Sequence, residues 1–263
     1  MNKVEKFYTT IGWESTDGNS QDAILWEDLR YCAEDYVSNC RKRINKYIPL
    51  SRDFILDMAS GPIQYPEYLD YHKNFKKRYC VDLSQSALDQ ARDRIGDKGE
   101  YYCGSFFDIE FQKNYFDCCI SLHTIYHIDK DLQESAVRKL LDIAKPNAPV
   151  IVIYSNPYNL IFRLVRFRNR LFGKKVPEVN LNSEEQPLYF FTYSNEWWSK
   201  FNDIASVEIL TWRFLKVEHS KKIISNNLIG KLLLALIFHL EETFLKYLAR
   251  YADYPMIILK KRI

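Results

Sequence analysis

The chain has 263 residues, which is enough for one large α/β domain with a substantial core or for two small domains. Apolar residues make up 47% of the chain, so its composition is that of an ordinary folded protein. The net charge of +3 is too small to indicate nucleic-acid binding by itself. The charge is also uneven, because residues 160–175 contain six cations and no acid.

The cysteines and the N-terminal residues give indications of the cellular compartment of the protein. None of the six cysteines lies in the paired C-x-x-C spacing of a zinc or redox site, and several fall in apolar runs. We therefore expect reduced, mostly buried thiols in a cytoplasmic protein. The first residues contain no apolar h-region, which argues against secretion. The longest apolar run, residues 232–238, is seven residues long, whereas a transmembrane helix needs roughly 20.

The first part of the chain alternates strand and helix patterns. Residues 1–19 are a polar arm with interspersed aromatic side chains, and apolar residues at steps of three and four predict an amphipathic helix over residues 24–47. Five strands then alternate with helices, which predicts a parallel sheet with right-handed crossovers. The predicted strands are residues 54–56, 79–83, 101–103, 116–122 and 150–154, and the helices are residues 65–71, 85–95 after an N-cap at Ser84, and 131–144.

The pattern changes after residue 155. A basic amphipathic helix (160–172) leads through a loop at 177–187 and an aromatic cluster at 188–193 to a short helix with Trp197 and Trp198. A strand (207–212), a long apolar helix (228–248) and a last strand (256–260) follow, with no internal repeat or low-complexity linker. The sequence therefore predicts one domain, with an N-terminal helical arm (1–50), a cofactor-binding half (51–155), lid insertions (156–206 and 215–250) and closing strands (207–214 and 255–261).

The end of the first predicted strand of the sheet carries the first indication of a ligand site. An apolar run is followed by Asp57 and then by the small residues Ala59, Ser60 and Gly61, so a ligand can approach the backbone closely. Ligands of open α/β sheets bind beyond the carboxyl ends of the strands. A carboxylate there repels the pyrophosphate of a dinucleotide and attracts a ligand that carries a sulfonium and an ammonium. S-adenosylmethionine fits that description.

An ordered set of short motifs resembles the class I S-adenosylmethionine-dependent methyltransferases. Within residues 54–155 it comprises the turn at 56–62, Asp82 closing the second strand, Gly104-Ser105 after the third, Phe116-Asp117 opening the fourth and Lys145-Pro146-Asn147 before the fifth. No single motif is specific, but the ordered set is. The resemblance implies a Rossmann-like, doubly wound sheet of seven strands, mostly parallel with an antiparallel last strand, and helical lid insertions.

The same resemblance implies the cofactor contacts. It puts Asp57 near the methionine amino group of S-adenosylmethionine and Asp82 on the two ribose hydroxyls. The other expected contacts are Ala59, Ser60, Gly61, Leu83, Ser105, Phe106, Leu122 and His123, with Tyr8 and Trp13 from an arm that covers the cofactor. A plain structural role stays open for Asp82, as a negative charge at a helix N-terminus beside Ser84.

The chain departs from the family pattern at three positions. Ala59 replaces the usual first glycine of the turn, and Ile63 replaces the third. Ser105 stands where an acid often holds the adenine amino group. Either Asp108 takes that role, or Ser105 and Phe106 suffice.

Two histidines follow the fourth strand, where the loop of this fold faces the methyl group. His123 and His127 are four residues apart and share a face if the segment is helical. A base there can take a proton from a hydroxyl or amine acceptor, and we favour His127 over His123 for this catalytic role. The alternative for each histidine, that it satisfies buried backbone groups, is about as plausible. Two histidines without a nearby third ligand make a poor metal site, so we expect no metal.

Aromatic and basic residues are the candidates for acceptor binding. Tyr126, Tyr154, Tyr189 and Phe191 could wall the acceptor pocket, although core packing is the commoner role of such residues. Arg163 and Arg166 belong to the basic helix, where the family builds its substrate lid. That helix is a solvated lid by default, and recognition of a phosphate-bearing acceptor or attachment to an anionic membrane surface are the alternatives.

These observations lead to one functional prediction and several rivals. We expect a methyltransferase that converts S-adenosylmethionine to S-adenosylhomocysteine and methylates an oxygen of a small molecule, a sugar or a lipid-linked saccharide. N- or C-methylation of another metabolite is the nearest alternative. A dinucleotide-dependent oxidoreductase should have glycine at position 63 and no acid at 57. A non-catalytic cofactor-binding protein or membrane-surface adaptor is the remaining rival, and we expect no nucleic-acid partner.

Overall fold

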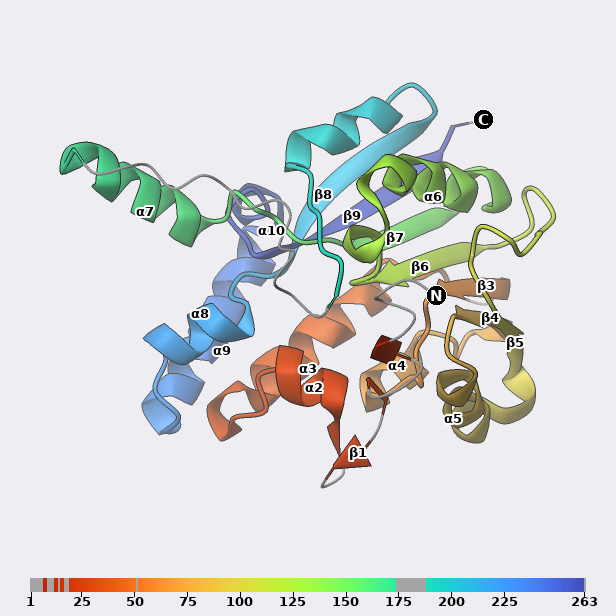
Figure 1. Cartoon of the computed structure of the whole chain (residues 1–263), viewed down its shortest axis with the longest axis horizontal. Coiled ribbons are helices and arrows are strands. Elements are labelled where there is room, and N and C mark those ends of the chain that lie inside the picture. The colour runs from red at the N-terminus through yellow and green to blue at the C-terminus, as the bar shows by residue number, and fades with distance from the viewer. Residues whose placement is uncertain are drawn as a thin grey trace.

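The computed structural model of the chain describes residues 7–8, 12–13, 15–16, 19–50, 52–173 and 188–262. Its centre is a seven-stranded sheet with the strand order β5-β4-β3-β6-β7-β9-β8 (Figure 1). The strands are β3 (Arg52–Met58), β4 (Phe75–Asp82), β5 (Gly99–Cys103), β6 (Cys118–Leu122), β7 (Pro149–Ile153), β8 (Ala205–Arg213) and β9 (Tyr254–Lys261).

The direction of the strands confirms the predicted fold class. The first five strands of the sheet run parallel, with Leu56 of β3 paired to Tyr79 of β4 and to Cys119 of β6. The last strand of the chain, β9, runs antiparallel to both of its neighbours, β7 and β8. Because β3 and β6 are adjacent at the centre while their crossovers lead in opposite directions, the carboxyl end of β3 lies at the switch point of the sheet.

Helices occupy both faces of the sheet, and alternating side chains of each strand bury against them. Leu56 and Val152 belong to a core shared with α6, whereas Ile55 and Ile153 belong to a core shared with α3 and α9. This period of two, with both faces apolar, is why the central strands read as continuous apolar runs. The helices of eight residues or more are α3 (Glu34–Arg43), α5 (Gln85–Ile95), α6 (Lys130–Ile143), α7 (Leu160–Leu171) and α9 (Leu228–Thr243).

Shorter elements complete the described residues. They are β1 (Ser15–Thr16), β2 (Asn19–Ser20), α2 (Gln21–Trp26), α4 (Pro66–Asp70), α8 (Val217–Ile223) and α10 (Leu245–Leu248), with 3-10 helices η1 (Tyr31–Ala33), η2 (Ile44–Lys46), η3 (Gly96–Lys98), η4 (Ile125–His127) and η5 (Asn195–Phe201). The predicted N-cap of α5 is confirmed, since the Ser84 hydroxyl accepts a hydrogen bond from the Ala87 amide.

Two helix predictions were wrong in extent. The single helix predicted over residues 24–47 is broken, because the backbone is extended at Glu27 and Arg30. Glu27 leaves the helix to bury its carboxylate against Arg41 and Arg213, while Leu29 on the supposed apolar face stays 49% exposed. The apolar helix predicted over residues 228–248 ends at Thr243, and α10 follows after Phe244. The loop predicted at 177–187 lies outside the described residues.

None of the helices in the described part of the chain is long and apolar enough to cross a membrane.

Candidate cofactor and acceptor site

The turn after β3 has three residues with left-handed backbone conformations. The φ angles are 58° at Ala59, 55° at Gly61 and 54° at Ile63. The turn thus keeps one backbone shape at all three positions where the family pattern has glycine, although two of them carry side chains here. Such conformations cost a residue with a side chain roughly 1–2 kcal/mol, and Ile63 is held in its conformation by complete burial in the core beside α5.

Asp82, at the end of β4, is hydrogen-bonded to this turn. One carboxylate oxygen accepts from the Gly61 amide at 2.8 Å and the other accepts from the Ser84 amide at 2.9 Å. Burial raises the pKa of Asp82 to about 6, and these amide donors oppose the rise. Each oxygen keeps a further lone pair, so the helix-terminus role and the ribose role proposed from the sequence are compatible.

Asp57 is bound by a residue that the sequence reasoning missed. Arg78, in the middle of β4, donates from both Nε and Nη2 to one Asp57 oxygen, and both side chains are buried. Burial raises the pKa of Asp57 and the guanidinium opposes that rise. The sequence contains little signal of this pairing, because Arg78 is the last of three consecutive cations in β4, and only its burial, which requires a buried acceptor, distinguishes it from Lys76 and Lys77. The predicted contact of Asp57 with the methionine amino group stays a prediction.

The N-terminal arm lies against the glycine turn. A Cβ atom placed on Gly61 would come within 2.9 Å of the Trp13 ring. Trp13 stacks on Tyr8 with ring centroids 4.9 Å apart, and the Tyr8 hydroxyl donates to Asp22 at 3.0 Å. The Trp13 indole nitrogen is buried without a hydrogen-bond partner among the described residues. The arm therefore places the Trp13 ring against the turn, together with an indole N–H that can donate a hydrogen bond.

The loop after β5 is held in place by hydrogen bonds from a lysine of α6. Lys139 donates to the carbonyls of Phe106, Phe107 and Ile109 at 2.7–3.0 Å, and the Ser105 hydroxyl accepts from the Phe107 amide. Phe106 is buried, whereas Asp108 is exposed. Leu83 lies across from this loop, because its carbonyl accepts from the Cys103 thiol at 3.6 Å. The loop has one fixed backbone path beside the end of β4.

His127 has a defined tautomer in the loop after β6. Its Nδ1 lies 2.7 Å from the Tyr189 carbonyl oxygen, which can only accept, so Nδ1 carries the proton. Burial lowers the pKa of His127 to about 4, and the ring is therefore neutral at physiological pH. Its Nε2 is then an unprotonated acceptor, which is the state that a general base requires.

His123 lies against Tyr126 and the last strands. Its φ is 59°, its Nδ1 is 3.0 Å from the Tyr126 hydroxyl, and its ring meets the edges of Trp212 and Tyr254. Burial lowers the pKa of His123 to about 3. The Tyr126 ring in turn packs against His127 at 4.6 Å. Both histidines therefore contact Tyr126, but not as neighbours on one helical face, because η4 begins at Ile125 and His123 lies before it in a left-handed conformation.

Comparison with known proteins finds a family model that matches the central part of the sheet. Residues 56–152 match the family model described as a methyltransferase domain. The matched segment begins in β3, ends in β7 and contains the Asp82 hydrogen bonds and the histidine loop. Residues 56–152 therefore form a methyltransferase domain, and the chain is similar to class I S-adenosylmethionine-dependent methyltransferases. A search of curated protein sequences finds no significant match.

Solved structures agree with the fold of this methyltransferase. A structure described as a DhpI-SAM-HEP complex has a TM-score of 0.57 at 11% identity and covers 98% of this chain and 96% of that one. A SAM-dependent methyltransferase from Archaeoglobus fulgidus has a TM-score of 0.53 at 14% identity, covering 88% and 97%. Phosphoethanolamine N-methyltransferase 1 from Haemonchus contortus, solved with phosphoethanolamine and S-adenosylhomocysteine, has a TM-score of 0.55 at 9% identity, covering 89% and 44%.

The residues around the turn of the methyltransferase fit its cofactor. The Asp82 carboxylate lies beside the Gly61 amide, and Gly61 has no side chain to block a ligand from the backbone. The Trp13 indole nitrogen is a hydrogen-bond donor without a partner among the described residues. No group of three or more His, Cys, Asp or Glu side chains among the described residues could hold a metal ion.

The predicted acceptor residues divide into two groups. Tyr126, Tyr189 and Phe191 surround the histidine loop, where the Phe191 amide donates to the Tyr126 carbonyl at 2.9 Å. Tyr154 does not line an open surface in this structure. It is fully buried, and its hydroxyl donates to Gln133 at 2.6 Å and accepts from the Tyr193 amide at 3.0 Å. It therefore supports the loop from the core.

Arg163 and Arg166 are exposed on α7, which projects from the body of the molecule (Figure 1). Arg163 donates to the Tyr158 carbonyl at 2.7 Å and lies over the Tyr251 ring. The interactions found among the described residues connect neither arginine with the histidine loop. Their role in binding an acceptor stays a prediction.

A buried charge network near His123 was also missed. Glu27 accepts from Arg41 at 2.7 Å and from Arg213 at 2.6 Å, and these two guanidiniums lower the pKa of Glu27 to about 2 against the effect of burial. All three groups act electrostatically on the His123 ring. In the sequence Arg41 falls in the predicted helix and Arg213 directly after the predicted strand 207–212, and nothing local pairs either of them with Glu27.

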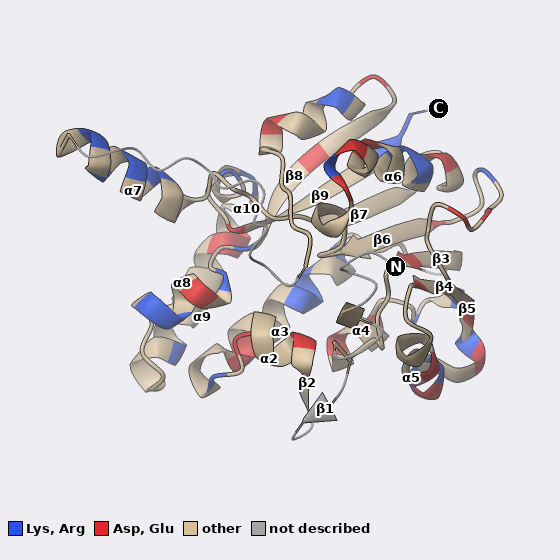
Figure 2. Cartoon of the chain, in the orientation of Figure 1, with Lys and Arg blue, Asp and Glu red and all other residues tan. Residues whose placement is uncertain are grey.

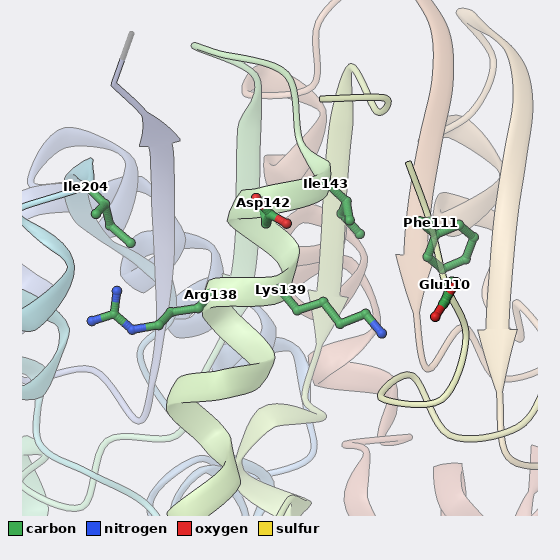
Figure 3. Close-up of a pocket in the computed structure, with 7 residues that line it drawn as sticks. All are labelled: Glu110, Phe111, Arg138, Lys139, Asp142, Ile143 and Ile204. Carbon is green, nitrogen blue, oxygen red and sulfur yellow. The ribbon is translucent and has the colours of Figure 1, made fainter. Parts of the chain in front are cut away.

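Figure 3 shows a surface hollow that is separate from this site. It has a volume of about 570 Å³ and lies along α6, where Lys139 points toward Glu110 and Arg138 points toward Ile204. It shares no lining residue with the predicted cofactor and acceptor contacts. Because Lys139 already donates to three carbonyls, the hollow offers little for ligand chemistry.

Proposed function

We propose that the methyltransferase methylates a hydroxyl oxygen of a small molecule, a sugar or a lipid-linked saccharide, with His127 as the general base. The observation that carries the proposal is the hydrogen bond from His127 Nδ1 to the Tyr189 carbonyl, which leaves Nε2 unprotonated. A hydroxyl has a high pKa and gains from such an acceptor as the oxygen attacks. An amine acceptor that enters as the free base needs no such group.

The cofactor supplies an electrophilic methyl group on its sulfonium. The chain then has three tasks. Asp82 would accept hydrogen bonds from the ribose hydroxyls, with its carboxylate held in place by the amides of Gly61 and Ser84. Trp13 and Tyr8 cover the turn and exclude water. Positioning of the acceptor oxygen in line with the methyl group supplies a large part of the rate acceleration.

His127 receives the acceptor proton at Nε2 in this proposal. The Tyr189 carbonyl accepts from the opposite nitrogen and so stabilises the imidazolium that forms. Tyr126 packs between the two histidines and fixes the direction of the His127 ring. Tyr189 and Phe191 connect the histidine loop with α6, so a change in either should alter acceptor positioning before it alters cofactor affinity.

Variants at His127 test the proposal. The protein is incubated with S-adenosylmethionine and a panel of hydroxyl and amine acceptors, and release of S-adenosylhomocysteine is measured. His127→Ala should reduce turnover of the active hydroxyl acceptor roughly 10²–10⁴-fold with unchanged cofactor affinity. His239→Ala, an exposed histidine on α9, is the matched control. Turnover that survives in His127→Ala, or is confined to amine acceptors, would contradict the proposal.

A further inference from the structure

An apolar stripe runs along the outer side of α7. Leu164, Phe167 and Leu171 follow one another at steps of three and four residues and are 56%, 63% and 67% exposed. Ile161, Phe162 and Val165 point away from this stripe and are partly buried. The helix therefore carries apolar residues on two sides, and only one of these sides is partly buried within the protein. Side chains of this size are rarely left in water in a row without a partner.

Arginines flank this stripe on both sides. With 100° between successive residues, Arg166 and Arg170 fall on one side of Leu164 and Leu171, and Arg168 falls on the other. The helix contains four arginines and no acid, and Figure 2 shows only basic and uncharged residues along it. None of the four arginines is in an ion pair with another described residue. An apolar stripe between cations is the pattern of a helix that lies in a membrane interface.

A second exposed apolar face lies at the same end of the long axis (Figure 1). On α9 it consists of Leu228, Ile229, Leu232, Leu233, Leu236 and Leu240, each 43–67% exposed. The first turn of α7 is tied to the segment that follows α10, because the Leu160 amide donates to the Tyr251 carbonyl at 2.8 Å. Both unpartnered faces therefore belong to the same end of the protein.

We propose that α7 and α9 dock the enzyme on the surface of an anionic phospholipid bilayer. The charge of α7 favours this occupant over a second copy of the chain, because a two-fold contact between two α7 helices would oppose eight arginines with no acid between them. Phospholipid headgroups of negative charge complement the arginines, and the acyl region takes the apolar stripe. The inference is independent of which acceptor the enzyme methylates.

Vesicle flotation tests the docking. The full chain is mixed with vesicles of phosphatidylcholine alone or with about 30% phosphatidylglycerol, at low and high salt. We expect binding to the anionic vesicles that weakens with salt, and little binding to the neutral ones. Each arginine near an anionic surface contributes roughly fivefold to binding, so Arg168→Glu/Arg170→Glu should reduce vesicle binding at least about 25-fold. Phe167→Glu and Leu232→Glu should each reduce it by removing an apolar contact.

Matched substitutions elsewhere separate docking from general effects. Leu132→Glu on α6 replaces a 46% exposed leucine, and Arg52→Glu at the start of β3 replaces an exposed arginine. Both should leave vesicle binding unchanged, and all variants should keep wild-type affinity for S-adenosylmethionine. Equal flotation of the α7 and α9 variants with wild type would overturn the proposal. So would a stable dimer that Leu232→Glu dissociates, in a protein that does not float with anionic vesicles.

Discussion

Gly61 offers a direct test of the contact between the N-terminal arm and the cofactor turn. Gly61→Ala adds one methyl group at a residue whose φ is 55° and whose Cβ would lie 2.9 Å from the Trp13 ring. The left-handed conformation costs alanine roughly 1–2 kcal/mol. Displacement of the indole, which is stacked on Tyr8, adds a packing cost of about 1–3 kcal/mol. We therefore expect Gly61→Ala to lower the free energy of unfolding by about 2–5 kcal/mol.

Two comparisons separate the backbone cost from the contact. Gly96 has a φ of 53°, and a Cβ atom placed on it would meet no atom within 4 Å, so Gly96→Ala should show the backbone cost alone. In a Trp13→Ala background, Gly61→Ala should cost only what Gly96→Ala costs. Urea denaturation gives the free energies of unfolding, and calorimetry gives the affinity for S-adenosylmethionine, which should fall in Gly61→Ala and not in Gly96→Ala. An equal cost of Gly61→Ala with and without Trp13 would show that the arm does not lie on the turn.

The other predictions concern protonation and cofactor binding. Asp82→Ala should weaken S-adenosylmethionine binding by about 1.5–3 kcal/mol, the scale of hydrogen bonds to a charged group, and unchanged affinity in calorimetry would remove Asp82 from the site. Because the pKa of Asp82 is raised to about 6, wild-type affinity should decline as the pH falls below 6, and this decline should be absent in Asp82→Ala. The pKa of His127 is lowered from 6.5 to about 4, so its contribution to stability is present above pH 6.5 and is lost as the pH falls toward 4. The wild type should lose up to about 2 kcal/mol of stability from this source between pH 7.5 and 5, and an equal loss in His127→Gln would refute the assignment.

The sheet could be predicted because its signals are local and repeated. The central strands β3, β6 and β7 each contain an apolar run of three to five residues, and their alternation with helices indicates a parallel order. The first helix could not be predicted correctly for a tertiary reason. Leu25 and Leu29 fit an apolar face by spacing, yet the burial of Glu27 between Arg41 and Arg213 extends the backbone there. Those partners lie 14 and 186 residues away in the chain.

The site was predictable to the extent that a motif fixes it locally. The family pattern implied that Asp82 and Gly61 belong to one site, and the structure joins them by a hydrogen bond that the sequence did not predict. Arg78 escaped notice because its pairing with Asp57 depends on how two neighbouring strands present their side chains within the sheet. Tyr154 was assigned to a pocket wall because aromatic residues near a strand end suit both a pocket and a core. Its two hydroxyl hydrogen bonds decide for the core.

The turn after β3 explains why glycine is required at position 61. Ala59 and Ile63 hold φ angles of 58° and 54° with side chains present, so backbone conformation alone does not demand glycine in this turn. Gly61 shares their conformation but is the position where a Cβ would strike the Trp13 ring. Its amide also donates to Asp82. Gly61 therefore lies where the N-terminal arm and Asp82 both approach the backbone of the turn, and a side chain at this residue would disturb both contacts.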